Sequence, residues 1–153
     1  PVLELEDGTR LPESNAILCF LGEGTKWLPA GRLERAQALS WMFWEQNRHE
    51  GVIAVRAAIL TYEDRAHLRT SDRLSDLLAR GQALLGIMEA RLAEADWLTD
   101  TGPTVADIAL YAYTHTAEDK GGFDLDPFPG IRAWLARLAS LPGYVGLDDI
   151  PDA

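Results

Sequence analysis

The apolar residues between positions 74 and 92 fall on one stripe of an α-helix. They follow one another at helical spacing, which keeps them on one face: Leu74, Leu77, Leu78, Gly81, Leu84, Leu85, Met88 and Leu92. The same spacing returns after a predicted helix start near Pro129: Ile131, Trp134, Leu135, Leu138 and Leu141. Apolar helical stripes must be buried against other elements, so the sequence predicts a mainly α fold built as a helical bundle.

Two more features add helices to this bundle. Residues 32 to about 62 contain no proline and a single glycine, Gly51, so we expect one long helical segment with a kink or a close contact at Gly51. Thr104 and Asp107 have the spacing of a capping box, in which each side chain accepts a hydrogen bond from a backbone N–H at the start of a helix. By itself this motif predicts a structural role and no chemistry.

The first 31 residues follow a different pattern. Residues 2–6 alternate apolar and acidic side chains, Asp7-Gly8 favours a tight turn, and residues 9–11 are expected to return as a second strand. Two strands alone are marginally stable in water, so this hairpin must pack on another element. Ser14 is expected to be the N-cap of a short helix from Asn15 to about Leu21, followed by a linker over residues 23–31.

Composition excludes several function classes. The chain has 153 residues, about the length of one domain, and a formal net charge of −10, which disfavours binding to nucleic acid or to an anionic membrane. No apolar run approaches the length of a membrane span. Cys19 is the only cysteine and is expected to be a buried, inert thiol, so we expect no disulfide and no metal site. A cytoplasmic location is the default for such a chain.

Four stretches of the chain, in this order, resemble the cytosolic glutathione transferases. They are Pro1-Val2-Leu3 with Asp7-Gly8, Leu11-Pro12-Glu13-Ser14-Asn15-Ala16-Ile17, the segment from Thr104 to Leu110, and the segment from Phe128 to Leu135 with Leu141-Pro142-Gly143-Tyr144. In the family they correspond to a cis-proline with its hairpin, a glutathione-binding motif, the capping box of a buried helix, and the following helix. The long helix from 34 to 58 is most similar to that of bacterial members.

The resemblance implies a division of the chain. Residues 1–25 would be the C-terminal part of a thioredoxin-like, α/β, glutathione-binding domain, with Pro1 as the structural cis-proline. Residues 32–153 would be the complete all-α C-terminal domain of a glutathione transferase. The family's catalytic Tyr, Ser or Cys lies in a β–α–β unit ahead of the hairpin, so we expect no catalytic residue in this sequence.

Glu13 and Ser14 are the expected glutathione-binding residues. A helix start offers free N–H groups, the positive end of the helix dipole and here a hydroxyl, all of which suit a carboxylate. Glu13 can pair with an ammonium. These two charges lie on one carbon in the γ-glutamyl end of glutathione, which would be a co-substrate, and no separate cofactor is expected.

Other candidates have structural alternatives. His49 is expected either to line the cleft for the second substrate or to be a solvated or interface histidine. The aromatic residues Trp41, Phe43 and Trp44 are expected in the core or in a subunit interface, and His67 and His115 in structural or surface positions.

The function implied by the resemblance is conjugation of the glutathione thiol to a hydrophobic electrophile. A non-catalytic binding or assembly module of the same fold is the alternative, and a plain acidic helical bundle remains if the four matches are coincidental. We also expect a homodimer in which the first two helices of each subunit face each other, because their apolar surface exceeds what this chain covers.

Overall fold

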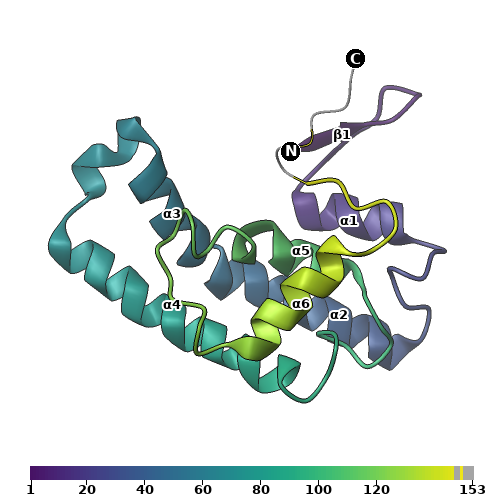
Figure 1. Ribbon diagram of the computed structural model, residues 1–153. Helices are drawn as coiled ribbons and strands as arrows, with labels where there is room; N and C mark the ends of the chain where they lie inside the picture. Colours follow the sequence, from purple (N-terminus) through teal and green to yellow (C-terminus); the bar gives the residue numbers. More distant parts are fainter. Residues whose placement is uncertain (147–148, 150–153) are drawn as a thin grey trace.

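The computed structural model describes residues 1–146 and 149 of the chain (Figure 1). The elements follow in the order β1 (Val2–Glu4), β2 (Arg10–Pro12), α1 (Ser14–Gly22), α2 (Arg32–Trp44), the π-helical turn η1 (Glu45–His49), α3 (Ile53–Thr61), the 3-10 helix η2 (Glu63–Leu68), α4 (Ser71–Leu92), α5 (Val105–Thr114) and α6 (Pro129–Ala139). Among the described residues, no helix combines the length and the apolar character needed to cross a membrane.

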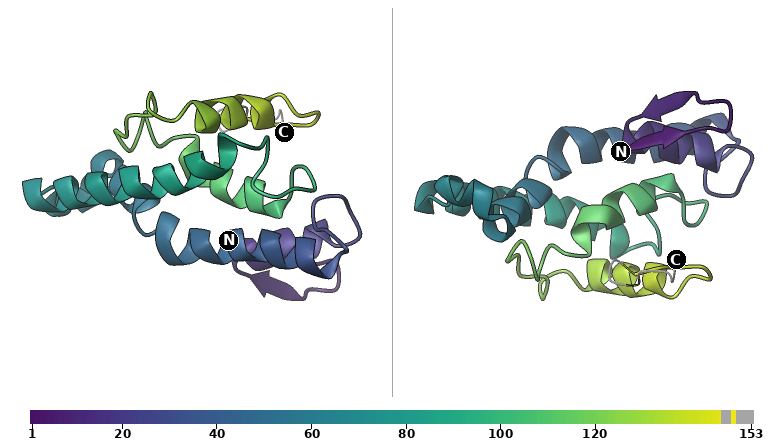
Figure 2. Two further views of the ribbon diagram at one scale, coloured as in Figure 1. Left: turned by 90° about the horizontal axis from the view of Figure 1, so that it is seen from below. Right: turned by 90° about the horizontal axis from the view of Figure 1, so that it is seen from above.

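The predicted hairpin is present at the N-terminus. Strands β1 and β2 are antiparallel, with Leu3 opposite Leu11. Between them, Gly8 adopts a φ of 83° and the Asp7 carboxylate accepts a hydrogen bond from Thr9 N at 2.9 Å. Both strands contact α1, which gives this small sheet the support that two strands need (Figure 2).

Helix α5 is the centre of the bundle. Six of its ten residues are buried, and it packs against α1, α2 and α3. Seen from below, α1 and α2 form one layer, α4 and α5 lie in the middle, and α6 covers the opposite side (Figure 2). Trp134 of α6 is fully buried in this core, as its place on the predicted stripe requires.

The capping box that starts α5 is formed as predicted. The Thr104 hydroxyl accepts a hydrogen bond from Ala106 N, and the Asp107 carboxylate accepts one from Thr104 N at 2.9 Å. Asp107 is completely buried, and it also accepts hydrogen bonds from Leu98 N and Trp134 Nε1. One carboxylate therefore joins the start of α5 to the preceding loop and to α6.

The predicted long helix over residues 32–62 is interrupted. The α-helical pattern of α2 widens into the π-helical turn η1, and the chain turns again at residues 50–52 before α3 begins. Gly51 lies at this break, and a Cβ there would meet nothing within 4 Å. The glycine therefore marks a kink and not a close contact.

Helix α6 is fixed by a residue far away in the sequence. The Glu89 carboxylate of α4 accepts hydrogen bonds from Gly130 N at 3.0 Å and Ile131 N at 2.9 Å, at the start of α6. A Cβ at Gly130 would lie 2.8 Å from the backbone of Leu92, so the two helices approach closely here. Glu89 thus satisfies N–H groups that a helix start leaves without partners.

Candidate functional site

The turn between β2 and α1 holds both residues expected to bind glutathione. Glu13 has a φ of 73° and is the only non-glycine residue with a positive φ among residues 1–146 and 149. This conformation turns the chain sharply, so that Glu13 precedes the helix and Ser14 is its first helical residue. The expectation that Ser14 is the N-cap of α1 is therefore wrong.

The first turn of α1 has free hydrogen-bond donors. No side chain caps the helix, and the first helical hydrogen bond joins Ile17 N to Glu13 O at 2.9 Å. Within the described part of the chain, no acceptor is bonded to the N–H groups of Ser14, Asn15 and Ala16. Glu13 and Ser14 are exposed, so these donors and the Ser14 hydroxyl can receive an anion from solvent.

Asn15 connects this turn to the end of α2. Its side-chain amide donates to Met42 O and to Glu45 Oε2, both at 3.3 Å. Glu45 is 2% exposed, and burial raises the pKa of its carboxyl, although the hydrogen bonds from Gln46 and Asn15 lower it. The residue next to Ser14 is thus held in place by a buried acid on η1.

The hydrogen bonds continue from Glu45 to the start of α3. Gln46 Nε2 donates to Glu45 Oε2 at 3.1 Å and to Glu50 Oε2 at 3.0 Å. The hydroxyl of Tyr113, in α5, donates to Glu50 Oε1 at 3.0 Å. Burial and this contact with Glu50 raise the pKa of Tyr113 to about 12, so the hydroxyl stays protonated at neutral pH. We call this chain of contacts, Asn15–Glu45–Gln46–Glu50–Tyr113, the polar connection.

A cleft of about 380 Å³ begins where the polar connection ends. It lies between α3 and the C-terminal end of α5, and its volume is in the usual range for small-molecule sites. Glu50 and Tyr113 line it near the start of α3, whereas Tyr62 and Arg65 line it beyond the far end of this helix. Several further lining side chains are small: Ala54, Ala57, Ala58 and Ala112. We call this cavity the α3–α5 cleft.

His49 does not line the α3–α5 cleft, and it is not solvated. It is fully buried, and its Nε2 lies 3.0 Å from the Thr114 hydroxyl, which donates to Leu110 O. Burial lowers the pKa of His49 to about 4, so the ring is neutral at pH 7. Its spacing from the buried residues Ala38, Met42 and Glu45 keeps His49 on the inner face of this helical segment, although polar residues precede it in the sequence.

His115, expected in a structural or surface position, is also one of the residues that line the α3–α5 cleft. Its ring is stacked on Tyr111 at 4.8 Å between ring centroids. Its Nδ1 donates to Tyr111 O at 2.8 Å, which fixes the orientation of the ring. His67, by contrast, is exposed in η2 and contacts Asp64 O through Nδ1.

Cys19 is half-buried on α1, less enclosed than expected. Burial raises the pKa of its thiol, which disfavours the reactive thiolate. Trp41 and Trp44 pack against the core, edge to face at 5.5 Å, but Phe43 points outward and is 63% exposed.

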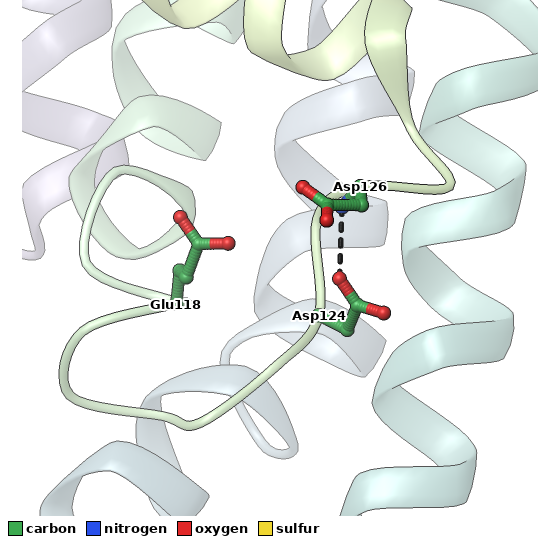
Figure 3. Close-up of side chains that lie close together, drawn as sticks. All are labelled: Glu118, Asp124 and Asp126. Carbon is green, nitrogen blue, oxygen red and sulfur yellow. Dashed lines mark hydrogen bonds between the residues drawn. The ribbon is translucent and has the colours of Figure 1, made fainter.

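Three exposed carboxylates lie close together after α5: Glu118, Asp124 and Asp126 (Figure 3). Their oxygens lie within 4.8 Å of one another, but Arg132 pairs with Glu118 at 2.6 Å and with Asp126 at 2.8 Å. Asp124 accepts a hydrogen bond from Asp126 N at 2.9 Å. The cluster is therefore an arginine-centred ion-pair group, and we assign no metal site to it.

Comparison with known proteins identifies the family. Residues 56–142, more than half of the chain, match the family described as "Glutathione S-transferase, C-terminal domain". The chain belongs to the glutathione S-transferase family. The resemblance noted in the sequence, and the mainly α fold with its leading hairpin, are both confirmed.

Several glutathione S-transferases share the fold closely. One from Pseudomonas fluorescens Pf-5 is 48% identical with a TM-score of 0.92, over 97% of this chain and 73% of that one. Another, from Xanthobacter autotrophicus Py2, is 46% identical with a TM-score of 0.90, over 97% and 72%. Among curated relatives, the disulfide-bond oxidoreductase YfcG of Escherichia coli is 29% identical over 140 residues. The chain covers 59% of the length of YfcG.

Within this glutathione S-transferase fold, the sequence located one part of the candidate site and missed another. Glu13 and Ser14 were found from a local motif, and the structure brings Asn15 beside them into the polar connection. The cleft residues Tyr113, Arg65 and Lys120 were not found, because they come from separate elements and share no spacing signal.

Proposed function

We propose that the protein is a glutathione S-transferase that binds glutathione at the Glu13–Ser14 turn and an electrophilic small molecule in the α3–α5 cleft. In the reaction, the thiolate sulfur forms a bond to an electrophilic carbon. The displaced group leaves with the bonding electrons, or the electrons move onto a conjugated acceptor that is then protonated. Family membership supports this function over the non-catalytic assembly module.

One observation carries this proposal: the polar connection links the turn to the cleft through hydrogen bonds of 3.0 to 3.3 Å. Two ligands that must react have to be held at a fixed separation. Asn15 fixes the start of α1, where one ligand would bind, and Tyr113 lines the cavity that would receive the other. Both are tied to the same short segment of chain around η1.

The turn has the chemistry that the γ-glutamyl end of glutathione requires. The N–H groups at the start of α1 and the Ser14 hydroxyl would bind its carboxylate, and the helix dipole would favour the negative charge. Glu13 would pair with its ammonium. No cofactor is part of this proposal, because glutathione itself supplies the reactive sulfur.

Activation of the thiol needs a further group. A thiol with a pKa of about 8.5 is only a few per cent ionised at neutral pH, so bound glutathione reacts slowly without a residue that stabilises the thiolate. We assign this role to none of the described residues. We therefore expect residues 1–153 to bind glutathione weakly and to conjugate it at the background rate, and robust turnover would show that these roles are wrong.

The binding proposal is tested by titrating the protein with glutathione and following backbone amides by NMR. Shifts should centre on residues 14–17. Ser14→Ala should weaken binding by about 1–3 kcal/mol, because it removes a hydrogen bond to a charged group. Ser75→Ala, an exposed serine on α4, is the matched control and should bind like the unchanged protein. Unchanged affinity in Ser14→Ala, or shifts centred elsewhere, would refute the assignment.

The name of YfcG suggests a second candidate, reduction of disulfides by glutathione. Two glutathione thiols would reduce one disulfide, releasing its two thiols and forming one glutathione disulfide. The raised pKa of Cys19 makes glutathione the better source of the thiolate. A chain that reduces 2-hydroxyethyl disulfide but does not conjugate electrophiles would favour this candidate. Either reaction fits a reducing cytoplasm, which is where we place the protein.

We also propose that the protein is a two-fold dimer. Large apolar side chains are exposed on the first two helices: Phe20, Leu21, Leu33 and Phe43. Leu33 and Phe43 are 67% and 63% exposed on α2, and exposed apolar surface of this kind is typical of interfaces. An isologous contact would pair these helices with their copies in a second chain.

A further inference from the structure

The α3–α5 cleft differs in charge from the rest of the chain. The protein has a formal net charge of −10, yet Arg65 and Lys120 both line this cavity. Glu50 is the one acidic residue among the described lining residues. Clefts lined by one sign of charge concentrate ligands of the opposite sign. The local excess of positive charge therefore bears on which molecules enter.

Both cations lack an ion-pair partner in the described part of the chain. Seven arginines form ion pairs within the described residues, but Arg65 and Lys120 form none there. The Arg65 guanidinium lies 5.7 Å from the centre of the Tyr62 ring, which also lines the cleft. Both cations can therefore bind an anionic ligand without first breaking an ion pair.

Both carboxylate oxygens of Glu50, the acid in the cleft, already accept hydrogen bonds. Glu50 Oε1 accepts the hydrogen bond from Tyr113, and Oε2 accepts the one from Gln46. Glu50 lies just before α3, between η1 and this helix, whereas Arg65 lies beyond its end, in η2. The cleft is therefore polarised along α3, from a hydrogen-bonded carboxylate at one end to a free guanidinium at the other.

The wall of the cleft between Glu50 and Arg65 suits a flat apolar group such as an aromatic ring. Ala54 and Ala58 are one helical turn apart on α3, and Ala112 faces the cavity from α5. The rings of Tyr62 and Tyr113 add aromatic surface at the two ends. Small side chains leave room for a ring, and aromatic side chains stack on one.

We propose that the second substrate is an aromatic electrophile that carries a carboxylate, an inference that rests on the proposed transferase function. Arg65 and Lys120 bind the carboxylate, and the aromatic ring lies along the alanines of α3. The reactive carbon then points toward Glu50 and Tyr113, the end that the polar connection joins to the Glu13–Ser14 turn. The two cations thereby determine both the selectivity and the orientation of the substrate.

The proposal is tested with two probes of almost the same shape, the anion 4-nitrobenzoate and the neutral 4-nitrobenzamide. Each is titrated into the protein by NMR at low ionic strength, and the shifted amides are mapped. We expect the anion to bind about tenfold more tightly, since two exposed cations contribute modestly to binding. Shifts should centre on Ala54, Ala58 and Thr116, and the preference should shrink as salt rises from about 20 to about 300 mM.

Variants separate the cleft from general electrostatics. The double variant Arg65→Gln and Lys120→Gln should lose the preference for the anion while still binding the amide. The matched control is Arg73→Gln with Lys26→Gln. These residues lie outside the cleft and also lack an ion pair in the described chain, so this variant removes the same charge and should keep the preference. Equal affinity for both probes, no binding of either, shifts outside the cleft, or a preference that survives in the double variant would overturn the proposal.

The outcome is distinguishable from a failure of the transferase function. Glutathione binding at residues 14–17 is measured in a separate titration without either probe. If glutathione binds there and the anion shows no preference, only the substrate class is wrong. If the anion binds the cleft selectively and glutathione does not bind at residues 14–17, the charge selectivity stands and the transferase proposal is wrong.

Discussion

Replacing Asp107 tests how strongly one buried carboxylate holds the bundle together. Asp107 accepts hydrogen bonds from Thr104 N at 2.9 Å, Leu98 N at 3.1 Å and Trp134 Nε1 at 2.9 Å. Asp107→Ala leaves these three buried donors, and the Thr104 hydroxyl at 3.2 Å, without this acceptor. Loss of the bond to Thr104 N is the loss of the cap and costs about 1 kcal/mol, and each of the other donors left unsatisfied costs about 1 kcal/mol or more, so we expect about 3–5 kcal/mol of destabilisation. The sequence alone suggested only the first of these contributions.

Urea unfolding followed by circular dichroism measures this loss. Asp72→Ala, in the exposed first turn of α4, is the control for the helix-dipole effect and should cost less than about 1 kcal/mol. Trp134→Phe removes one of the three donors, so it should couple with Asp107→Ala by about 1 kcal/mol in a double-mutant cycle. If Asp107→Ala costs no more than Asp72→Ala, or if the two core changes are additive, the shared carboxylate is not the link we describe.

Two further predictions concern pH and association. Because the folded state lowers the pKa of His49 to about 4, stability is lost as pH falls from about 6.5 toward 4, by about 2 kcal/mol between pH 7.5 and 5.0, and His49→Gln should remove this part of the slope. The raised pKa of Glu45 has the opposite effect on stability, so Glu45→Gln should make the loss of stability at low pH larger. Urea unfolding at pH 7.5 and 5.0 measures both effects. If His49→Gln loses as much stability between these pH values as the unchanged protein, the ring of His49 is not buried and neutral as described. Phe43→Ser should shift a micromolar sample from dimer to monomer in sedimentation, whereas Ile87→Ser, exposed on α4, should not, and a monomeric unchanged protein would rule out the dimer.

Local signals predicted most of the fold. The hairpin, the capping box and the helix starts near residues 104 and 129 depend on a few adjacent residues, and each was found where expected. Partners far apart in the sequence left no such signal. Trp134 and Leu98 reach Asp107 from different segments, and Glu89 caps a helix about forty residues later, so only the folded chain reveals these contacts.

The candidate site was predicted in part for the same reason. Glu13 and Ser14 belong to one motif, but the left-handed backbone of Glu13 moved the helix start by one residue. His49 was judged by the polar residues beside it in the sequence, although its helical spacing from Ala38, Met42 and Glu45 places it on the buried face. Lys120 lies in a loop after α5, where no periodicity applies.

Both candidate binding regions depend on the winding of the chain at η1. A π-helical turn holds one residue more than the same stretch of α-helix, so deleting one residue within Glu45–His49 would return it to regular winding. Asn15 donates a hydrogen bond to Glu45 within this turn, and Glu50, which follows it, lines the cleft. A single insertion or deletion at η1 would therefore alter the support of the Glu13–Ser14 turn and one end of the cleft in the same evolutionary step.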